Sequence, residues 1–240
     1  MKEFFERPKI AFDYRKEAKR ICDPYANKLA KIFLVYLGII IVVGIIEGFC
    51  FDADLDYGYG WTGEVSWYNG LISFVCAGPL SFSLIYISKK VYAGIEPRIG
   101  DLLEGFKDFG KIFIIQILEL VFIVLWSLLL VIPGIIKIFA YSMSYYVAMD
   151  NPNLSPNECL KESQRIMKGH KWELFTLVFG YLGWILLSAL TLGILSLWVL
   201  PRIQQALYLF YLEVSGLGLH PNKKTSNVSE EVVEEIIIKD

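Results

Sequence analysis

Six apolar stretches dominate this chain, and nearly all of them are long enough to cross a lipid bilayer. A transmembrane helix needs about 20 mainly apolar residues, because each helical residue advances the chain by about 1.5 Å. Hydrophobic residues make up 55% of the 240 and the mean hydropathy is +0.48, which a soluble domain of this length does not carry. We therefore expect an all-α fold, a polytopic transmembrane helical bundle of about six spans. The stretches are 32–50, 67–88, 112–132, 134–149, 172–196 and 198–215, of which only 134–149 is clearly short.

Basic residues gather in the segments that connect alternate stretches. Nine Lys or Arg lie in 1–31, five in 89–111, four in 150–171 and three in 216–240, whereas the acidic loop 51–66 has none. Short loops rich in Lys and Arg stay in the cytoplasm. We therefore expect three transmembrane hairpins in a plasma membrane, with both termini cytoplasmic. The net charge of −2 offers no basic field for nucleic acid.

The chain divides into an N-terminal cytoplasmic or interfacial helix (1–31), a six-span domain (32–215) and a polar cytoplasmic tail (216–240). In the first part, Tyr14 and Ala18 recur at helical spacing, with Arg15 and Lys19 among the basic residues around them. Such a basic amphipathic helix can lie on an anionic leaflet, or it can be a solvated connector to the first span.

Two cytoplasmic connectors are predicted to be short amphipathic helices along the inner surface. In 95–111 the apolar residues share one face, and in 150–171 Ser155 is a natural N-cap, followed by Pro156 and, three residues after the cap, Glu158. The sequences that precede spans three and five are similar. This similarity suggests a repeated unit, an amphipathic helix followed by a transmembrane hairpin, that occurs three times, although chance similarity of apolar segments explains it too. The apolar face of the first connector comprises Ile99, Leu102, Leu103 and Phe106.

The run from Pro133 to Tyr211 resembles a known family. Its landmarks are IPGIIKIFAYSMSYYVAMDNPNLSP, ECLKESQRIMKGHKWELF, GWILLSALTLGI and LWVLP, in that order. Together they are similar to the bacterial integral membrane proteins called domain of unknown function 975, and YRKEAKR (14–20) and AGPLSFSL (77–84) resemble its N-terminal half. The resemblance implies a bacterial plasma-membrane protein, similar in architecture to the membrane domain of some glycerophosphodiester phosphodiesterases. It implies no activity.

Ionisable residues inside spans are the first candidates for function, because burying a charge in hydrocarbon costs at least about 2.5 kcal/mol. Glu119 and Gln116 form a polar stripe one helical turn apart in span three. The pair could be a proton or cation site, or it could hold helices together through hydrogen bonds.

Two basic residues follow the prolines that open spans four and six. Lys137 and Arg202 should lie at or just under the outer interface, either snorkelling to headgroups, pairing with Glu47 in the GxxxG of span one, or lining a cavity for an anion. The polar faces of the even-numbered spans could surround a central cavity, or they could hold a solid bundle together through hydrogen bonds between helices. Their further members are Tyr141, Ser144 and Gln205.

No enzyme signature or metal-ligand spacing is present, so we expect no catalytic residue, no metal and no cofactor. His170, Lys171 and Trp172 mark the cytoplasmic interface, and a Cys50–Cys76 disulfide competes with free, buried thiols. We expect a non-enzymatic protein that binds membrane lipids, an amphipathic small molecule, a partner membrane protein or a second copy of itself. The alternative is a small transporter or channel with Glu119 as its coupling carboxylate.

Overall fold

The computed structural model describes residues 11–51, 70–129, 131–191 and 193–216, and every regular element within these ranges is a helix. The predicted all-α fold is therefore confirmed. Residues 52–66 of the acidic loop, almost all of the tail 216–240 and the side chain of Cys50 lie outside the described residues, so their predictions are not tested. The elements are α1 (Ala11–Cys22), η2 (Asp23–Tyr25), α2 (Ala26–Phe51), α3 (Leu71–Tyr92), η3 (Ile99–Phe106), α4 (Phe109–Leu129), α5 (Val131–Tyr141), α6 (Ser144–Asp150), α7 (Pro156–Ile166), α8 (Lys171–Phe179), α9 (Leu182–Leu190) and α10 (Ser196–Val214).

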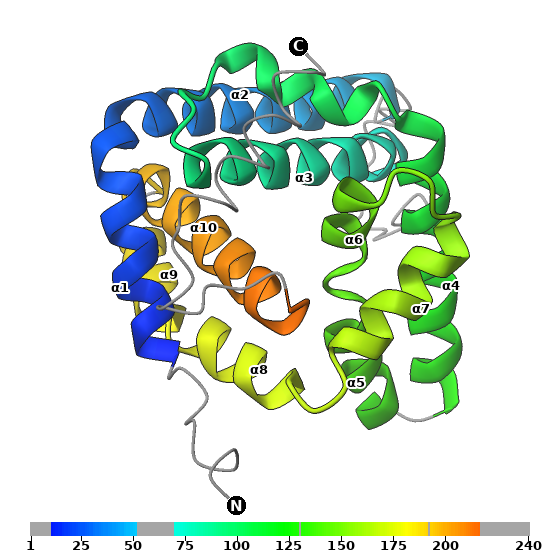
Figure 1. The fold of residues 1–240 in the computed structure, drawn as a ribbon. Coiled ribbons are helices and arrows are strands. Elements are labelled where there is room, and N and C mark those ends of the chain that lie inside the picture. The colour runs from blue at the N-terminus through cyan, green and yellow to red at the C-terminus, as the bar shows by residue number, and fades with distance from the viewer. Residues whose placement is uncertain (1–10, 52–69, 130, 192, 217–240) are drawn as a thin grey trace, which may run out of the picture.

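The helices do not all run parallel to one another. Figure 1 shows α2 and α3 side by side, whereas α1 and α4 run across them at the two ends. α7 lies beside α4, and α10 passes through the middle, where it packs on α1, α2 and α3. The hairpin partners α2 and α3, and α4 and α5, contact each other as predicted, but the bundle is closed by crossing helices.

Four helices of the described residues are long and apolar enough to cross a membrane, against six predicted. They are Tyr14–Glu47, Leu71–Tyr92, Phe109–Leu128 and Lys171–Leu190. Span four differs because α5 and α6 are separate helices. Ser163 of α7 stabilises the break: its hydroxyl donates to the carbonyl of Ala140 at 2.9 Å and accepts the N–H of Met143 at 3.2 Å. Span six differs because α10 carries Arg202, two glutamines and Glu213, which lower its hydropathy.

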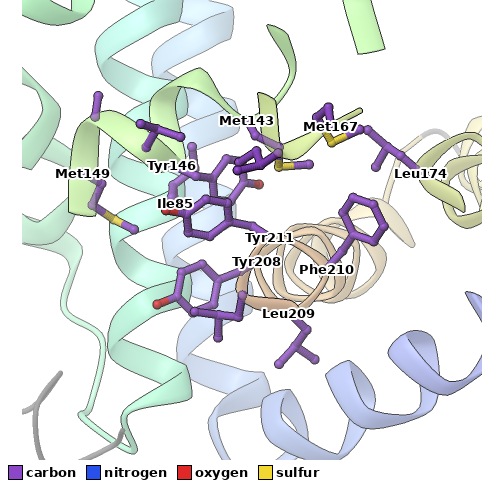
Figure 2. Packing of buried hydrophobic residues seen from close by; sticks show 14 of the residues in the cluster. Ile85, Met143, Tyr146, Met149, Met167, Leu174, Tyr208, Leu209, Phe210 and Tyr211 are labelled. Carbon is purple, nitrogen blue, oxygen red and sulfur yellow. The ribbon is translucent and has the colours of Figure 1, made fainter. Parts of the chain in front are cut away.

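The largest core cluster is rich in tyrosine. Tyr208 and Tyr211 of α10 pack against Tyr146 of α6, with ring centroids 6.4 Å and 5.2 Å from it, respectively. Figure 2 shows these rings beside Ile85 of α3, with Met143 and Met149 near them. Each buried aromatic ring removes about 150–250 Å² from solvent, so this cluster fixes the C-terminal half of α10 against α3 and α6.

The first connector is a 3₁₀-helix, and only Leu102 of its predicted apolar face is buried in the protein. η3 buries Asp101, Leu102 and Gly105, while Ile99, Leu103 and Phe106 stay exposed. A 3₁₀-helix has three residues per turn, so Leu102 and Gly105 align on one face. A Cβ at Gly105 would meet the carbonyl oxygen of Pro79 at 2.0 Å, so only glycine allows this approach to α3.

The second connector follows its prediction closely. α7 begins at Pro156, and the side chains and backbone of Ser155 and Glu158 form a capping box. Pro24 lies in the short η2 turn between α1 and α2.

Candidate functional site

The most distinctive site is a cavity of about 300 Å³ between α1, the α8–α9 junction and α10, which we call the α1–α9–α10 cavity. Four of its seven residues are cationic and two are aromatic. Its lining comprises Arg15, Lys16, Lys19, Tyr181, Trp184, Val199 and Arg202. A cavity with convergent cations on one side and apolar surface on the other suits a ligand with an anionic head and an apolar body.

Arg15 is positioned by the bend between α8 and α9. Its Nη1 donates to the carbonyl oxygen of Gly180 at 2.7 Å, and its Cζ lies 5.8 Å from the centre of the Tyr181 ring. A Cβ at Gly180 would lie 3.0 Å from both Cζ and Nη1 of Arg15, a spacing tighter than most real Cβ contacts. Glycine at 180 therefore leaves the room that the guanidinium occupies.

Arg202 lies on the opposite wall, near the start of α10. Its Nη2 is 3.2 Å from Oδ1 of Asp23, which belongs to η2, and its carbonyl oxygen accepts the Tyr181 hydroxyl at 3.5 Å. Val199 completes this wall. The ion pair is partly exposed, since the two side chains keep 30% and 49% of their surface.

Lys16 and Lys19 supply the charge that faces solvent. Both side chains are exposed, and neither makes an ion pair with another described residue. Glu17, between them in sequence, pairs with Arg20 at 2.6 Å. The two ammonium groups therefore remain available to a ligand.

Trp184 gives the cavity its apolar side. The indole is 49% exposed, and its neighbours on α9 are exposed as well. Tryptophan favours positions where one end is apolar and the other is wet, as at the edge of a bilayer. The exposed neighbours are Leu182, Ile185, Leu186 and Leu187.

Lys137 and Arg202 have other partners than Glu47, with which the sequence suggested a pairing, and both cations contact segments that the sequence assigns to the cytoplasmic side. Arg202 contacts Asp23 in the predicted cytoplasmic N-terminal part, and Lys137 Nζ donates to Oε1 of Gln164 at 3.2 Å, in the predicted cytoplasmic connector α7. Glu47 accepts both the N–H and the hydroxyl of Ser73, at 2.7 and 2.6 Å. α5 ends at Tyr141, before α6 begins, and Lys137 of α5 lies close enough to α7 to contact Gln164.

Lys137 is half-buried and lies against two aromatic rings. Its ammonium lies 4.9 Å from the centre of the Trp126 ring and 5.5 Å from that of Tyr141. Cation–π contacts of this kind favour a lysine in apolar surroundings.

Four of the predicted intramembrane polar residues lie along the α4–α5–α6 contact. The Ser144 hydroxyl contacts the carboxylate of Glu119 and the carbonyl of Tyr141, and the Tyr141 ring leads to Lys137. Gln116 points elsewhere: its Nε2 donates to the Phe74 carbonyl of α3 at 2.6 Å. This set is a polar seam between packed helices.

The remaining predicted residues are distributed between the core and the surface. Gln205 is 1% exposed on α10, and its Nε2 has no hydrogen-bond partner among the described residues. His170 Nδ1 lies 3.0 Å from Glu173, and Trp172 is exposed and stacks on Phe175. Lys171 begins α8 and is half-buried. Arg15 and Lys19, expected at the interface, both line the cavity.

Sequence reasoning missed two buried ion pairs at the end of α3. Lys89 Nζ lies 3.1 Å from Asp150, and Lys90 Nζ lies 3.0 Å from Asp101. Both lysines are less than 6% exposed as side chains, although the sequence places them in a basic connector. The signal was available in part, because both partners are acidic residues at or near helix ends: Asp101 in the first turn of η3 and Asp150 at the end of α6.

It also missed Tyr181, Trp184 and Val199 of the cavity, and the GYLGW run at 180–184, which holds the two aromatic residues, was the visible hint. Within the described ranges, no cluster of three or more His, Cys, Asp or Glu could hold a metal ion. Cys22, Cys76 and Cys159 are free thiols, the first and last of them buried.

Comparison with known proteins places part of the chain in a family. The family model described as "Protein of unknown function (DUF975)" matches residues 127–218, a range that holds α5 to α10 but not α1. The landmarks between Pro133 and Tyr211 lie inside this range, so the resemblance is confirmed there, while 14–20 and 77–84 lie outside it. No curated protein and no solved structure matches the chain.

Proposed function

We propose a function from the chain's own geometry, because the chain belongs through residues 127–218 to the DUF975 family, whose function is unknown. The proposed function is to bind a membrane amphiphile by its anionic headgroup in the α1–α9–α10 cavity. The observation that carries the proposal is the lining of this cavity, in which four cations converge beside an exposed indole.

The composition of the cavity supports a ligand that belongs to the membrane. Arginine and lysine bind phosphate and carboxylate groups through charge-assisted hydrogen bonds. Basic clusters near a membrane attract anionic lipid, worth about 1 kcal/mol per Lys or Arg at the surface. A water-soluble anion without an apolar part would not bury the apolar surface of Trp184 and Val199, whereas an amphiphile would.

Native mass spectrometry of the detergent-purified chain, titrated with an anionic and a zwitterionic phospholipid of equal chain length, tests the proposal. We expect the anionic lipid to bind and the double variant Lys16→Gln/Lys19→Gln to lose most of this binding. Lys161→Gln, an exposed lysine on α7, is the matched control and should bind as the unchanged protein does. Equal binding of both lipids, or equal loss in the control, contradicts the proposal.

A second candidate function is transport coupled to Glu119. The observation that favours it is the contact of this carboxylate with Ser144 between α4 and α6, in helices that otherwise bury mainly apolar residues. Ionisable groups inside a bundle often mark ion or proton pathways. Flux into liposomes that disappears in Glu119→Gln would establish transport, and absence of flux with lipid retained would favour binding alone.

The wider predictions accompany this proposal. They are a bacterial plasma membrane, both termini in the cytoplasm, a threefold internal repeat, no enzymatic activity, and a partner membrane protein or a second copy as a further occupant of the surface. The Lys- and Arg-rich connectors support the orientation.

A further inference from the structure

The charges around the α1–α9–α10 cavity are not equivalent. Arg202 is already paired with the carboxylate of Asp23, and Arg15 donates to the Gly180 carbonyl. Lys16 and Lys19 are exposed and make no ion pair within the described residues. The other titratable group at the cavity wall is the Tyr181 phenol, whose hydroxyl donates to the Arg202 carbonyl.

We infer that the cavity selects amphiphiles whose headgroup is a doubly charged phosphomonoester over those whose headgroup is a singly charged phosphodiester. This inference rests on the proposed function and specifies its ligand class. Two lysines without counter-charges match two negative charges, whereas a diester would leave one ammonium without a partner. A terminal phosphate also presents three oxygens, enough to contact both lysines and the guanidinium of Arg15 together.

The apolar wall indicates where the rest of the ligand lies. Trp184 and Val199 line the cavity, and the exposed leucines and isoleucine of α9 continue from Trp184 along the helix. An acyl chain attached to the phosphate can follow this surface. The ligand class is therefore a lipid phosphomonoester, and a free phosphate ester shares only its head.

The test compares three ligands on the full-length protein in detergent: phosphatidic acid, phosphatidylglycerol of the same chains, and water-soluble glycerol phosphate. One additional charge-assisted contact corresponds to about tenfold in affinity. We expect phosphatidic acid to bind about tenfold more tightly than phosphatidylglycerol at a pH well above the second ionisation of its phosphate, where it carries two negative charges. At a pH well below that ionisation the preference should vanish, because both headgroups then carry one charge.

Variants separate the contributions of the residues. Lys19→Gln should abolish most of the preference for phosphatidic acid while Lys161→Gln keeps it, and thermal unfolding of both variants verifies that they fold. Asp23→Asn should tighten binding of both lipids, because it frees Arg202 without adding a cation.

The outcomes are distinguishable. Equal affinity for phosphatidic acid and phosphatidylglycerol overturns the inference and leaves the proposed function standing. Binding of neither lipid overturns both. Glycerol phosphate that competes as strongly as phosphatidic acid overturns the lipid assignment, since the apolar wall would then contribute nothing.

Discussion

Gly180 shows how one missing side chain can determine the position of a cation. The residue ends α8 with an ordinary helical φ of −63°, so its backbone does not require glycine. The requirement comes from space, because the Arg15 guanidinium lies where a Cβ would make close contact. Arg15 and the Gly180 carbonyl to which it donates are 165 residues apart in the sequence.

We predict that Gly180→Ala weakens anionic lipid binding by about tenfold, because the displaced Arg15 loses a hydrogen bond from a charged donor worth about 1.5–3 kcal/mol. Titration of the purified variant with anionic lipid measures this. Gly183→Ala is the matched control: no atom lies within 4 Å of its Cβ position, so it should bind normally. It should even gain up to about 1 kcal/mol of helix stability. Equal affinity of the two variants contradicts the prediction.

Residue types in the cavity are predictable from sequence, whereas their convergence is not. Arg15, Lys19 and Arg202 all stand out as basic residues beside apolar stretches. Their meeting depends on which face of α1 packs on α10, and nothing local specifies a contact between segments so far apart. The burial of Lys89 and Lys90 could not be predicted for the same reason. Each lysine looks solvent-exposed in the sequence, because the aspartate that pairs with it belongs to another element.

The two buried ion pairs anchor whole elements to the end of α3. Asp101, in the first turn of η3, accepts the Arg98 N–H at 2.8 Å and contacts the ammonium of Lys90. Asp150 is the last residue of α6. Its carboxylate pairs with Lys89 and also forms a hydrogen bond with the side chain of Tyr211 in α10. Each aspartate thus ties a connector to the membrane helix.

We predict that Lys90→Met destabilises the protein by about 3–5 kcal/mol, because it leaves the Asp101 carboxylate buried without its cation. Adding Asp101→Asn should recover part of this loss, since the amide oxygen can still accept the Arg98 N–H. Unfolding in detergent measures both. Arg165→Ala breaks an exposed pair with Glu162 and should cost less than about 1 kcal/mol. A Lys90→Met variant as stable as Arg165→Ala would falsify the anchoring role.

The cap of α7 makes a pH-dependent prediction. Hydrogen bonds from the Ser155 N–H and hydroxyl hold the pKa of Glu158 below its usual range. A depressed pKa means that the stabilisation is present above the carboxyl's ordinary pKa, about 4.3, and is lost as the pH falls through the folded value. We therefore expect amide hydrogen exchange in Pro156–Ile166 to quicken, relative to the intrinsic rate, on acidification. Glu158→Gln should remove this pH dependence, and persistence of the dependence in the variant contradicts it.

Some helix boundaries are determined by nearby residues and can be predicted from the sequence, whereas others depend on distant residues and cannot. The start of α7 is predictable, because Ser155, Pro156 and Glu158 form a local cap. The break between α5 and α6 is not, because its stabilising hydroxyl belongs to Ser163, twenty residues further on. Apolar composition alone therefore suggests one continuous span where the chain makes two helices.

At the scale of the molecule, contacts at the α6–α7 corner bear on how the chain crosses the membrane. Lys111, at the start of α4, donates to the carbonyls of Asn151 and Pro152 at 3.1 and 3.0 Å. Lys89, near the end of α3, pairs with Asp150. The connector after α6 thus lies against the connector between α3 and α4. Both are rich in Lys and Arg, so they share a side of the membrane by charge as well as by contact.

This arrangement predicts the outcome of cysteine labelling in intact cells. In a background with the four native cysteines replaced by alanine, Asp108→Cys and Asn153→Cys introduce exposed thiols on the two connectors. We expect a membrane-impermeant maleimide to reach neither until the membrane is permeabilised, because the Lys- and Arg-rich composition of both connectors predicts that they face the cytoplasm. Asp56→Cys, in the acidic segment predicted outside, should react without permeabilisation. Labelling of residue 153 but not residue 108 in intact cells would place the connectors on opposite sides, which the Lys89–Asp150 and Lys111 contacts do not allow.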